Sequence, residues 1–298
     1  MVCAFSGVAG DIFSYGPLRG KRCLIRASSH ICTQYALLSG EQIRSKCSIG
    51  LPSPWIIQRE QKEYELADLI IVLSTFAYKS FISDGVPAKK IKILSLGTDT
   101  TKFLASSNTI ESRLHRILSE KKLQVLMVGS FSFRKGATDL VQIAFATKEF
   151  CRFKFVGDIG GAGEMKLAKT AYEVIEFVPR QSEMELASQY IWGDVFIFPT
   201  IEDGYAVVLA QAQASGLPIL TTPNCAGPDI IEHGLSGWIL PVRSPSCFVS
   251  QLLWCHTHRS DLASMVRHIH QSKNLRDWRA VADDFLAIVK GYRGSKGA

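Results

Sequence analysis

The sequence predicts an α/β fold built on doubly wound parallel sheets, and three observations support this class. Short apolar runs typical of buried strands alternate with longer segments of helical spacing along most of the chain. The composition, 47% hydrophobic and 20% charged over 298 residues, is that of a globular protein with an ample core. Residues 194–222 read as strand, acidic turn, helix, glycine stop and strand, which together make a βαβ unit.

The first hundred residues predict a small set of strands and helices. Residues 1–20 are glycine-rich and weakly patterned, so no element is predicted there. Strands are predicted over 22–26, 68–74 and 91–94, and helices after residue 28, over 55–67 and over 76–83. Ser74 or Thr75 can cap the last of these helices. A polar stretch over 104–122 is expected to carry a short helix and to connect two domains.

The rest of the chain alternates more regularly. Strands are predicted over 123–128, 153–156, 174–178, 194–199 and 219–222, with a last short strand before Pro241. Helices are predicted over 138–147, 183–190, 247–270 and 276–290. In a doubly wound sheet a ligand lies outside the carboxyl ends of the strands, where the strand order reverses. We therefore expect the functional residues in the loops that follow these strands.

One such loop organises the prediction of function. Asp203 is a plausible N-cap for the helix that follows, and Gly204 allows close approach of the backbone to a ligand. Free N–H groups at a helix start form an anion site suited to a phosphate. A second loop, 129–136, is basic, but it lacks the glycine that a P-loop requires at Arg134.

Composition excludes several other classes. The net charge of +7 suits an anionic partner, but no Lys/Arg run and no module indicates nucleic-acid binding. The eight cysteines contain no CxxC pair and read as small buried hydrophobes. Four histidines near the C-terminus, at 256, 258, 268 and 270, show no metal-ligand spacing. The sequence has no apolar run long enough to span a membrane, and its start lacks the pattern of a signal peptide.

Residues 200–218 resemble the donor-binding motif of the retaining, GT-B-fold glycosyltransferases of group 1, family-4 type. That motif reads E-G-F-G-L-V-x-L-E-A-x-A-x-G-x-P, and alignment on its end sets Asp203 at the first Glu and Gln211 at the second. A second resemblance lies in the first domain, where the family's ordered pattern matches Ser28-Ser-His-Ile31, Glu60 to Tyr64, Ala67-Asp68, Gly85-Val-Pro87 and Gly97 to Phe103. Together the matches cover roughly residues 20 to 290.

The resemblance implies a role for each matching residue. His30 and Asp203 would contact the donor sugar at the scissile bond, Gln211 would hold the ribose, and Val178 and Arg180 would lie near the base. The diphosphate would meet Ser130, Arg134, Lys135, Gly204, Tyr205, Ala206, Val207 and Val208. Ser130 stands where the family has Arg, so Arg134 is expected to supply that charge. Ala206 replaces a glycine, and Glu202 is an alternative to Asp203 for the first acid.

The resemblance also implies an architecture and a reaction. The fold would be GT-B, with two Rossmann-like domains facing a cleft. Residues 1–104 would be a partial acceptor-side domain, 105–272 the donor domain, and 273–298 a helix that returns to the first domain through Trp278. Too few residues precede Ser28 for more than one βα unit, so the first domain is expected to be incomplete.

The implied activity is transfer of a hexose-type sugar, with retention, from a nucleotide-diphosphate donor. The acceptor would be a glycan, a lipid or a small molecule, and no metal or other cofactor is expected. The expected location is the cytoplasm, with peripheral contact at the inner membrane face left open. The alternative is a non-catalytic nucleotide-sugar-binding or scaffold fragment that needs a partner chain. Gln211, Ser130 and the short first domain favour this alternative, whereas Lys135 and Asp203-Gly204 favour the enzyme.

Overall fold

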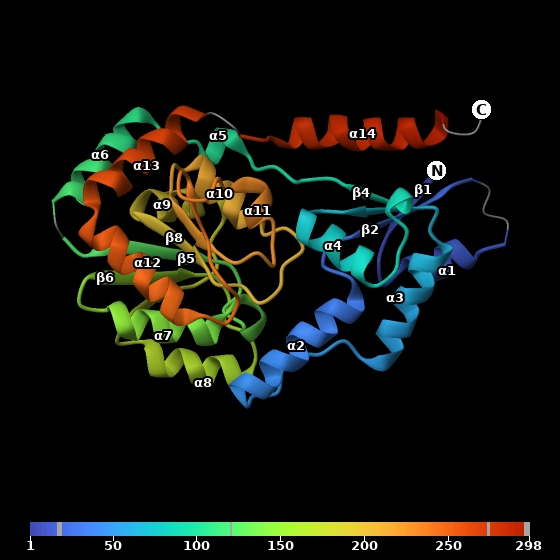
Figure 1. The fold of residues 1–298 in the computed structure, drawn as a ribbon, viewed down its shortest axis with the longest axis horizontal. Helices are drawn as coiled ribbons and strands as arrows, with labels where there is room; N and C mark the ends of the chain where they lie inside the picture. Colours follow the sequence, from blue (N-terminus) through green and yellow to red (C-terminus); the bar gives the residue numbers. More distant parts are fainter. Residues whose placement is uncertain (17–19, 120, 273–274, 295–298) are drawn as a thin grey trace.

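The computed structural model describes residues 1–16, 20–119, 121–272 and 275–294, which form two separate parallel sheets (Figure 1). The smaller sheet has the strand order β1-β2-β3-β4, and the larger one β10-β9-β8-β5-β6-β7. All strand pairs within these described sheets are parallel. The predicted α/β class with doubly wound parallel sheets is therefore confirmed.

The first sheet and its helices occupy the N-terminal third of the chain. Its strands are β1 (Val2–Phe5), β2 (Arg22–Arg26), β3 (Leu69–Val72) and β4 (Ile91–Ile93). Its helices are α1 (Ala9–Ser14), α2 (Ile31–Ser45), α3 (Pro54–Leu66), α4 (Thr75–Ser83) and the 3-10 turn η1 (Ala88–Lys90). Ser74, one of the two predicted caps, caps α4 by accepting a hydrogen bond from the Ala77 N–H.

The sequence did not predict β1 and α1. In β1 only Ala4 is buried, because this strand forms one edge of its sheet and pairs with β2 alone. An edge strand of four residues carries little apolar pattern, so periodicity has nothing to detect. By contrast, β3 lies between two strands and is buried at all four positions, which made its apolar run easy to recognise.

The second sheet forms the larger core. Its strands are β5 (Leu123–Val128), β6 (Cys151–Val156), β7 (Ile175–Val178), β8 (Val195–Phe198), β9 (Ile219–Thr221) and β10 (Gly237–Ile239). The helices around it are α6 (Ser107–Leu118), α7 (Ala137–Thr147), α8 (Ala162–Ala171), α9 (Glu183–Trp192), α10 (Val207–Ala214), α11 (Gly227–Ile230), α12 (Pro245–Thr257) and α13 (Arg259–Ser272), with the 3-10 turn η2 (Phe133–Lys135) after β5. Figure 1 shows α7 and α8 on one face of this sheet and α9 and α10 on the other.

Two helix predictions differ from the structure in their limits. The helix predicted over 247–270 is two helices, because the chain leaves helical geometry at His258 between α12 and α13. The helix predicted to start at Gly204 starts at Val207, because Ala206 has a left-handed conformation with φ of 67°. Helix α8 was not predicted.

Two linkers connect the first domain to the second, and they lie side by side. The first contains α5 (Thr100–Phe103), and the second leads into α14 (Trp278–Gly294). Thr98 pairs with Asp277 between them, and a Cβ at Gly97 would lie 2.5 Å from the carbonyl oxygen of Arg276. The boundary predicted at residue 104 falls between α5 and α6, whereas residues 273–274 and 295–298 of the predicted C-terminal segment lie outside the described residues.

Helix α14 extends back over the first sheet (Figure 1). Val281, Phe285 and Ile288 share a hydrophobic cluster with Cys23, Leu69, Ile71 and Leu94. The prediction that Trp278 anchors this helix was wrong, because its side chain is 48% exposed. Trp278 is the first residue of the helix and sits beside the linker pairing, so the residues one turn and more beyond it make the contact with the sheet.

Candidate functional site

The loop after β8 is shaped by the carboxylate of Asp203. Its Oδ1 accepts hydrogen bonds from the backbone N–H groups of Tyr205 (3.1 Å) and Ala206 (3.0 Å). These contacts fix the turn just before α10 rather than capping the helix itself, which corrects the predicted N-cap. The N–H groups of the first helical residues, Val207 and Val208, remain the orphan donors of the helix start.

The second oxygen of Asp203 binds Lys135. Lys135 Nζ lies 2.5 Å from Asp203 Oδ2 and 3.3 Å from the Glu202 carbonyl oxygen. Lys135 comes from η2 after β5, so the structure brings together the two predicted loops. Burial alone would raise the pKa of Asp203, but the charge and hydrogen bond of Lys135 outweigh it and leave that pKa below its usual value.

Glu202, the alternative to Asp203 for the first acid, contacts the first domain. Its buried carboxylate points to the first domain, where Oε1 accepts from the Ser28 hydroxyl (2.8 Å), the Ser29 N–H (3.0 Å) and the Ser29 hydroxyl (2.9 Å). Burial alone would raise the pKa of Glu202. The charge of Arg134 and these hydrogen bonds have the larger combined effect, so the pKa lies below its usual value. The sequence resemblance included the Ser-Ser-His segment but did not assign Ser28 or Ser29 to the site.

Arg134 completes this contact. Its Nε and Nη2 both lie 2.8 Å from Glu202 Oε2, and Nη2 also donates to the Ser28 hydroxyl at 2.8 Å. The guanidinium was predicted to serve a donor diphosphate. In the structure its partners are the Glu202 carboxylate and the Ser28 hydroxyl, and the contact with a diphosphate stays a prediction.

Gly204 was predicted to let a ligand approach the backbone closely. The structure gives the glycine another neighbour: a Cβ at this position would lie 2.0 Å from the Ala27 carbonyl oxygen. The loop after β8 and the turn after β2 are therefore in backbone contact. Only a residue without a side chain fits between them.

Ion pairs join the C-terminal part of helix α2, in the first domain, to the second domain. Arg44 bridges to the buried carboxylate of Asp139 on α7 (2.5 Å), and Arg243 pairs with the buried Glu41 (3.0 Å). With Glu202 at the N-terminal end of α2, polar contacts hold both ends of this helix across the domain interface.

A cavity of about 370 Å³ opens at the carboxyl ends of β5, β6 and β7. Ser130 and Arg180 line it together with Asp158, Gln181 and other residues of these loops. The oxygen of the Gln181 amide is buried without a hydrogen-bond partner. Val178 lies at the end of β7, where its carbonyl accepts from the Gly157 N–H, and it lines a neighbouring hollow instead. Position and size suit a nucleobase.

Gln211 lies on α10 next to Tyr190 of α9. The Tyr190 hydroxyl donates to Gln211 Oε1 at 2.8 Å and also lies 3.4 Å from the Val208 carbonyl. The amide oxygen is thereby occupied, and the two amide N–H donors of Gln211 remain for a ligand.

The side chain of His30 contacts residues of the first domain. Its buried ring packs against Tyr64 and Phe81, and its Nδ1 lies 3.0 Å from Asp84, all within the first domain. Burial is the main cause that lowers the pKa of His30, with Arg26 adding to it and Asp84 opposing it. The His30 ring also caps α2 by accepting from the Cys32 N–H, and its contact with the donor sugar stays a prediction.

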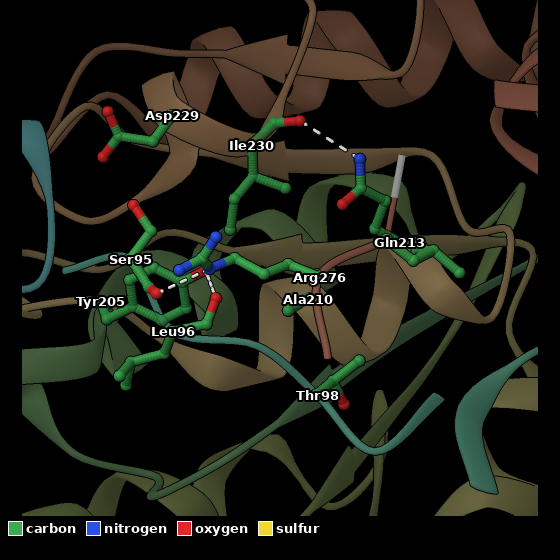
Figure 2. A pocket seen from close by; sticks show the side chains of 10 residues that line it. Ser95, Leu96, Thr98, Tyr205, Ala210, Gln213, Asp229, Ile230 and Arg276 are labelled. Carbon is green, nitrogen blue, oxygen red and sulfur yellow. Dashed lines mark hydrogen bonds between the residues drawn. The ribbon is translucent and has the colours of Figure 1, made fainter. Parts of the chain in front are cut away.

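Tyr205 connects the loop after β8 to the linkers. Its hydroxyl donates to the Leu96 carbonyl at 2.5 Å. Tyr205 lines a polar cavity of about 240 Å³, and Figure 2 shows it there with Gln213, Asp229 and Arg276. Arg276 donates to the Ser95 carbonyl at 2.9 Å, and Asp229 accepts from the Thr75 N–H at 2.8 Å. This cavity therefore lies between both linkers, the loop after β8 and the helices α10 and α11.

Comparison with known proteins identifies the domain that holds Lys135 and Asp203. Residues 122–258 match the family described as glycosyl transferases group 1. The chain carries a group 1 glycosyltransferase domain of the GT-B fold. Among solved structures, sucrose-phosphate synthase from Thermosynechococcus elongatus superposes with a TM-score of 0.72 at 17% identity, over 94% of this chain and 70% of that one. WaaG, a glycosyltransferase involved in lipopolysaccharide biosynthesis, gives 0.68 at 15% identity, over 94% and 80%.

The curated relatives of this chain are distant in sequence. The amylovoran biosynthesis glycosyltransferase AmsK of Erwinia amylovora is 23% identical over 77% of this chain and 58% of the relative. The GDP-mannose-dependent alpha-mannosyltransferase of Mycobacterium tuberculosis is 26% identical over 78% of this chain and 59% of the relative. The chain thus spans less than two thirds of the length of these relatives. Among its described helices, none combines the length and apolar character needed to span a bilayer.

Proposed function

We propose that the chain binds a nucleotide-diphosphate sugar in its second domain and transfers a hexose-type sugar with retention. The observation that carries this proposal is the pairing of Lys135 with Asp203 beside the start of α10. A cation, a carboxylate and orphan amides meet there at the carboxyl side of the parallel strands, where a doubly wound sheet binds its ligands.

The proposed roles follow from this arrangement. Lys135 and the N–H groups of Val207 and Val208 would stabilise the charge that develops on the leaving diphosphate. Asp203 would orient the sugar, Gln211 would donate to the ribose, and the cavity at Ser130 and Arg180 would hold the base. The proposal needs no metal, since a lysine and backbone amides supply the positive charge.

The relatives narrow the donor and acceptor to be tested. One relative is named for GDP-mannose, and the HepE structure from Anabaena, with a TM-score of 0.65 at 17% identity, contains UDP-glucose. AmsK and the colanic acid protein WcaL are named for polysaccharide biosynthesis. We therefore propose a glycan or lipid-linked acceptor and a cytoplasmic location with contact at the inner face of the membrane.

Calorimetric titration with UDP and with GDP tests the donor site. We expect saturable binding of one nucleotide and a loss of about tenfold, or ~1.4 kcal/mol, in Lys135→Ala. Lys169→Ala, which removes an exposed lysine of α8, is the matched control and should bind as the parent does. A folded chain that binds neither nucleotide would refute the donor site.

A second candidate is a non-catalytic nucleotide-sugar-binding protein completed by a partner chain. The specific observation in its favour is that Arg134 and Lys135 are both paired with carboxylates, so neither cation is free for the diphosphate. Incubation with UDP-glucose and GDP-mannose separates the two candidates. Nucleotide binding without consumption of either sugar donor would support the second candidate, and release of UDP or GDP would support the enzyme.

A further inference from the structure

The first domain brings together three side chains that commonly bind metals. His30 precedes α2 as its N-cap, Cys32 lies in the first turn of α2, and Asp84 follows the last turn of α4. The nitrogen, sulfur and oxygen donor atoms of these residues all lie within 4.8 Å of one another. Across the described residues, this is the single group of three or more His, Cys, Asp and Glu side chains with such spacing.

The surroundings hold two of the donors in place. The His30 ring is fixed by Tyr64 and Phe81, with ring centroids at 4.9 and 5.0 Å, and the His30 N–H donates to the Ser80 hydroxyl. The Thr33 hydroxyl donates to Asp84 Oδ2 at 2.9 Å, while this same oxygen lies 3.0 Å from His30 Nδ1. Hydrogen bonds that orient ligands in this way are typical of the second shell of metal sites.

The remaining contacts are weak enough for a metal to replace. The Cys32 N–H donates to His30 Nδ1 at 3.3 Å, and the Gln61 amide donates to the Cys32 sulfur at 3.4 Å. With Zn–N near 2.0–2.1 Å and Zn–S near 2.3 Å, the donors of a tetrahedral zinc site lie roughly 3.3–3.8 Å apart. Closing from the present spacing requires movement of about one ångström from Cys32 and Asp84, which are not in the core.

We propose that His30 Nδ1, Cys32 Sγ and the Asp84 carboxylate form a binding site for Zn²⁺ or a similar divalent ion. A cavity of about 320 Å³ that His30 and Asp84 line leaves room for water as the fourth ligand. Three protein ligands and one open position are a common arrangement for zinc in proteins. Binding would release the Cys32 thiol proton to solvent, since the thiolate is the ligand.

The metal site would stabilise the domain interface and would take no part in the transfer of a sugar. His30 follows directly after Ser28 and Ser29, which hold the Glu202 carboxylate of the other domain. An ion that joins α2 to α4 would stiffen this turn, and so stabilise the contact between domains. This role is independent of the proposed transferase function.

Titration of the metal-stripped chain with Co²⁺ under reducing, anaerobic conditions tests the site. We expect one equivalent to produce a thiolate-to-cobalt charge-transfer band with intense tetrahedral d–d bands, and Zn²⁺ to abolish both. The Cys32→Ser variant should lose the charge-transfer band. Asp84→Asn and Thr33→Val should weaken Co²⁺ binding by about tenfold or more.

Cys3→Ser is the matched control, because Cys3 is an exposed cysteine outside the group. It should bind Co²⁺ as the parent does. A folded parent without the band, or a band that persists in Cys32→Ser, would overturn the site. Thr33→Val keeps the test decisive if Cys32→Ser fails to fold, since loss of Co²⁺ affinity supports the site and unchanged affinity contradicts it.

Discussion

Glu202 Oε1 accepts hydrogen bonds from both the N–H and the hydroxyl of Ser29, which lies 173 positions earlier in the chain. This one buried carboxylate joins the loop after β8 in the second domain to the turn that follows β2 in the first. Arg134, next to Lys135, balances its charge. The domain interface and the loop after β8 therefore depend on the same carboxylate.

Glu202→Gln should weaken the interface. The amide keeps the shape of the side chain but loses the charge, and hydrogen bonds to a charged group contribute about 1.5–3 kcal/mol each. We expect urea denaturation to show a loss of stability of about that size. Hydrogen exchange should also become faster at residues 27–34, which the carboxylate holds.

Glu149→Gln is the control for this variant, because Glu149 is exposed at the end of α7's connection to β6. It should change neither the stability nor the exchange. Equal exchange rates at residues 27–34 in Glu202→Gln and the parent would contradict the contact.

Gly204→Ala should force the domains apart. The added Cβ would lie 2.0 Å from the Ala27 carbonyl oxygen, and both partners are backbone, so neither can rotate away. Overpacking of this kind costs about 1–3 kcal/mol. Thermal unfolding would measure the loss, with Gly50→Ala as the control, since a Cβ at Gly50 meets nothing within 4 Å. Similar melting temperatures for the two variants would disprove the close contact.

Ala206→Gly should stabilise the chain slightly. Ala206 has a φ of 67°, and a left-handed conformation costs a non-glycine residue roughly 1–2 kcal/mol. Glycine removes that strain but adds about 0.4–1 kcal/mol of unfolded-state entropy, so the net gain should be about 0.5 kcal/mol. Ala210→Gly, inside α10, should instead destabilise by about 1 kcal/mol. Denaturation midpoints that shift alike in both variants would rule out the strain.

Acid should destabilise the folded chain through Glu202, which lies at the domain interface, and through Asp203, which holds the loop after β8. Both pKa values are lowered in the folded chain, because Arg134 and Lys135 outweigh the effect of burial. The stability they contribute is present above their unfolded values, about 4.3 and 3.9, and is lost as the pH falls through the lower folded values. Glu202→Gln should therefore lose less stability than the parent between pH 5 and 3, as about one carboxylate fewer titrates. Parallel pH profiles would argue against the lowered pKa of Glu202.

Gln211→Glu should strengthen nucleotide binding if this side chain meets the ribose. A carboxylate forms charge-assisted hydrogen bonds about twice as strong as those of an amide, so a gain of about 1 kcal/mol, or roughly fivefold, is expected. The Tyr190 hydroxyl, 2.8 Å from Gln211 Oε1, can donate to either side chain. Calorimetry with the nucleotide that the parent binds measures the change, and weaker binding in Gln211→Glu would place the ribose elsewhere.

Much of the fold follows from local pattern. The buried run of β3 and the Ser74 cap of α4 were predicted correctly because each depends on neighbouring residues alone. Strand β1 escaped prediction because an edge strand with one buried residue has no clear period. The break at His258 and the late start of α10 at Val207 were missed, since they depend on single backbone conformations that composition does not reveal.

By itself, the sequence determined the parallel α/β class and the loops that carry Lys135 and Asp203, because strand periodicity and loop position are local properties. Only the tertiary structure decided the partners of the charges. Arg134 pairs with Glu202, His30 lies beside Asp84, and Gly204 contacts the backbone of Ala27. Helix α14 packs on the first sheet through Val281, whereas the sequence had predicted Trp278. Each of these pairings joins residues far apart in the chain, and their distances depend on how the sheets and helices pack.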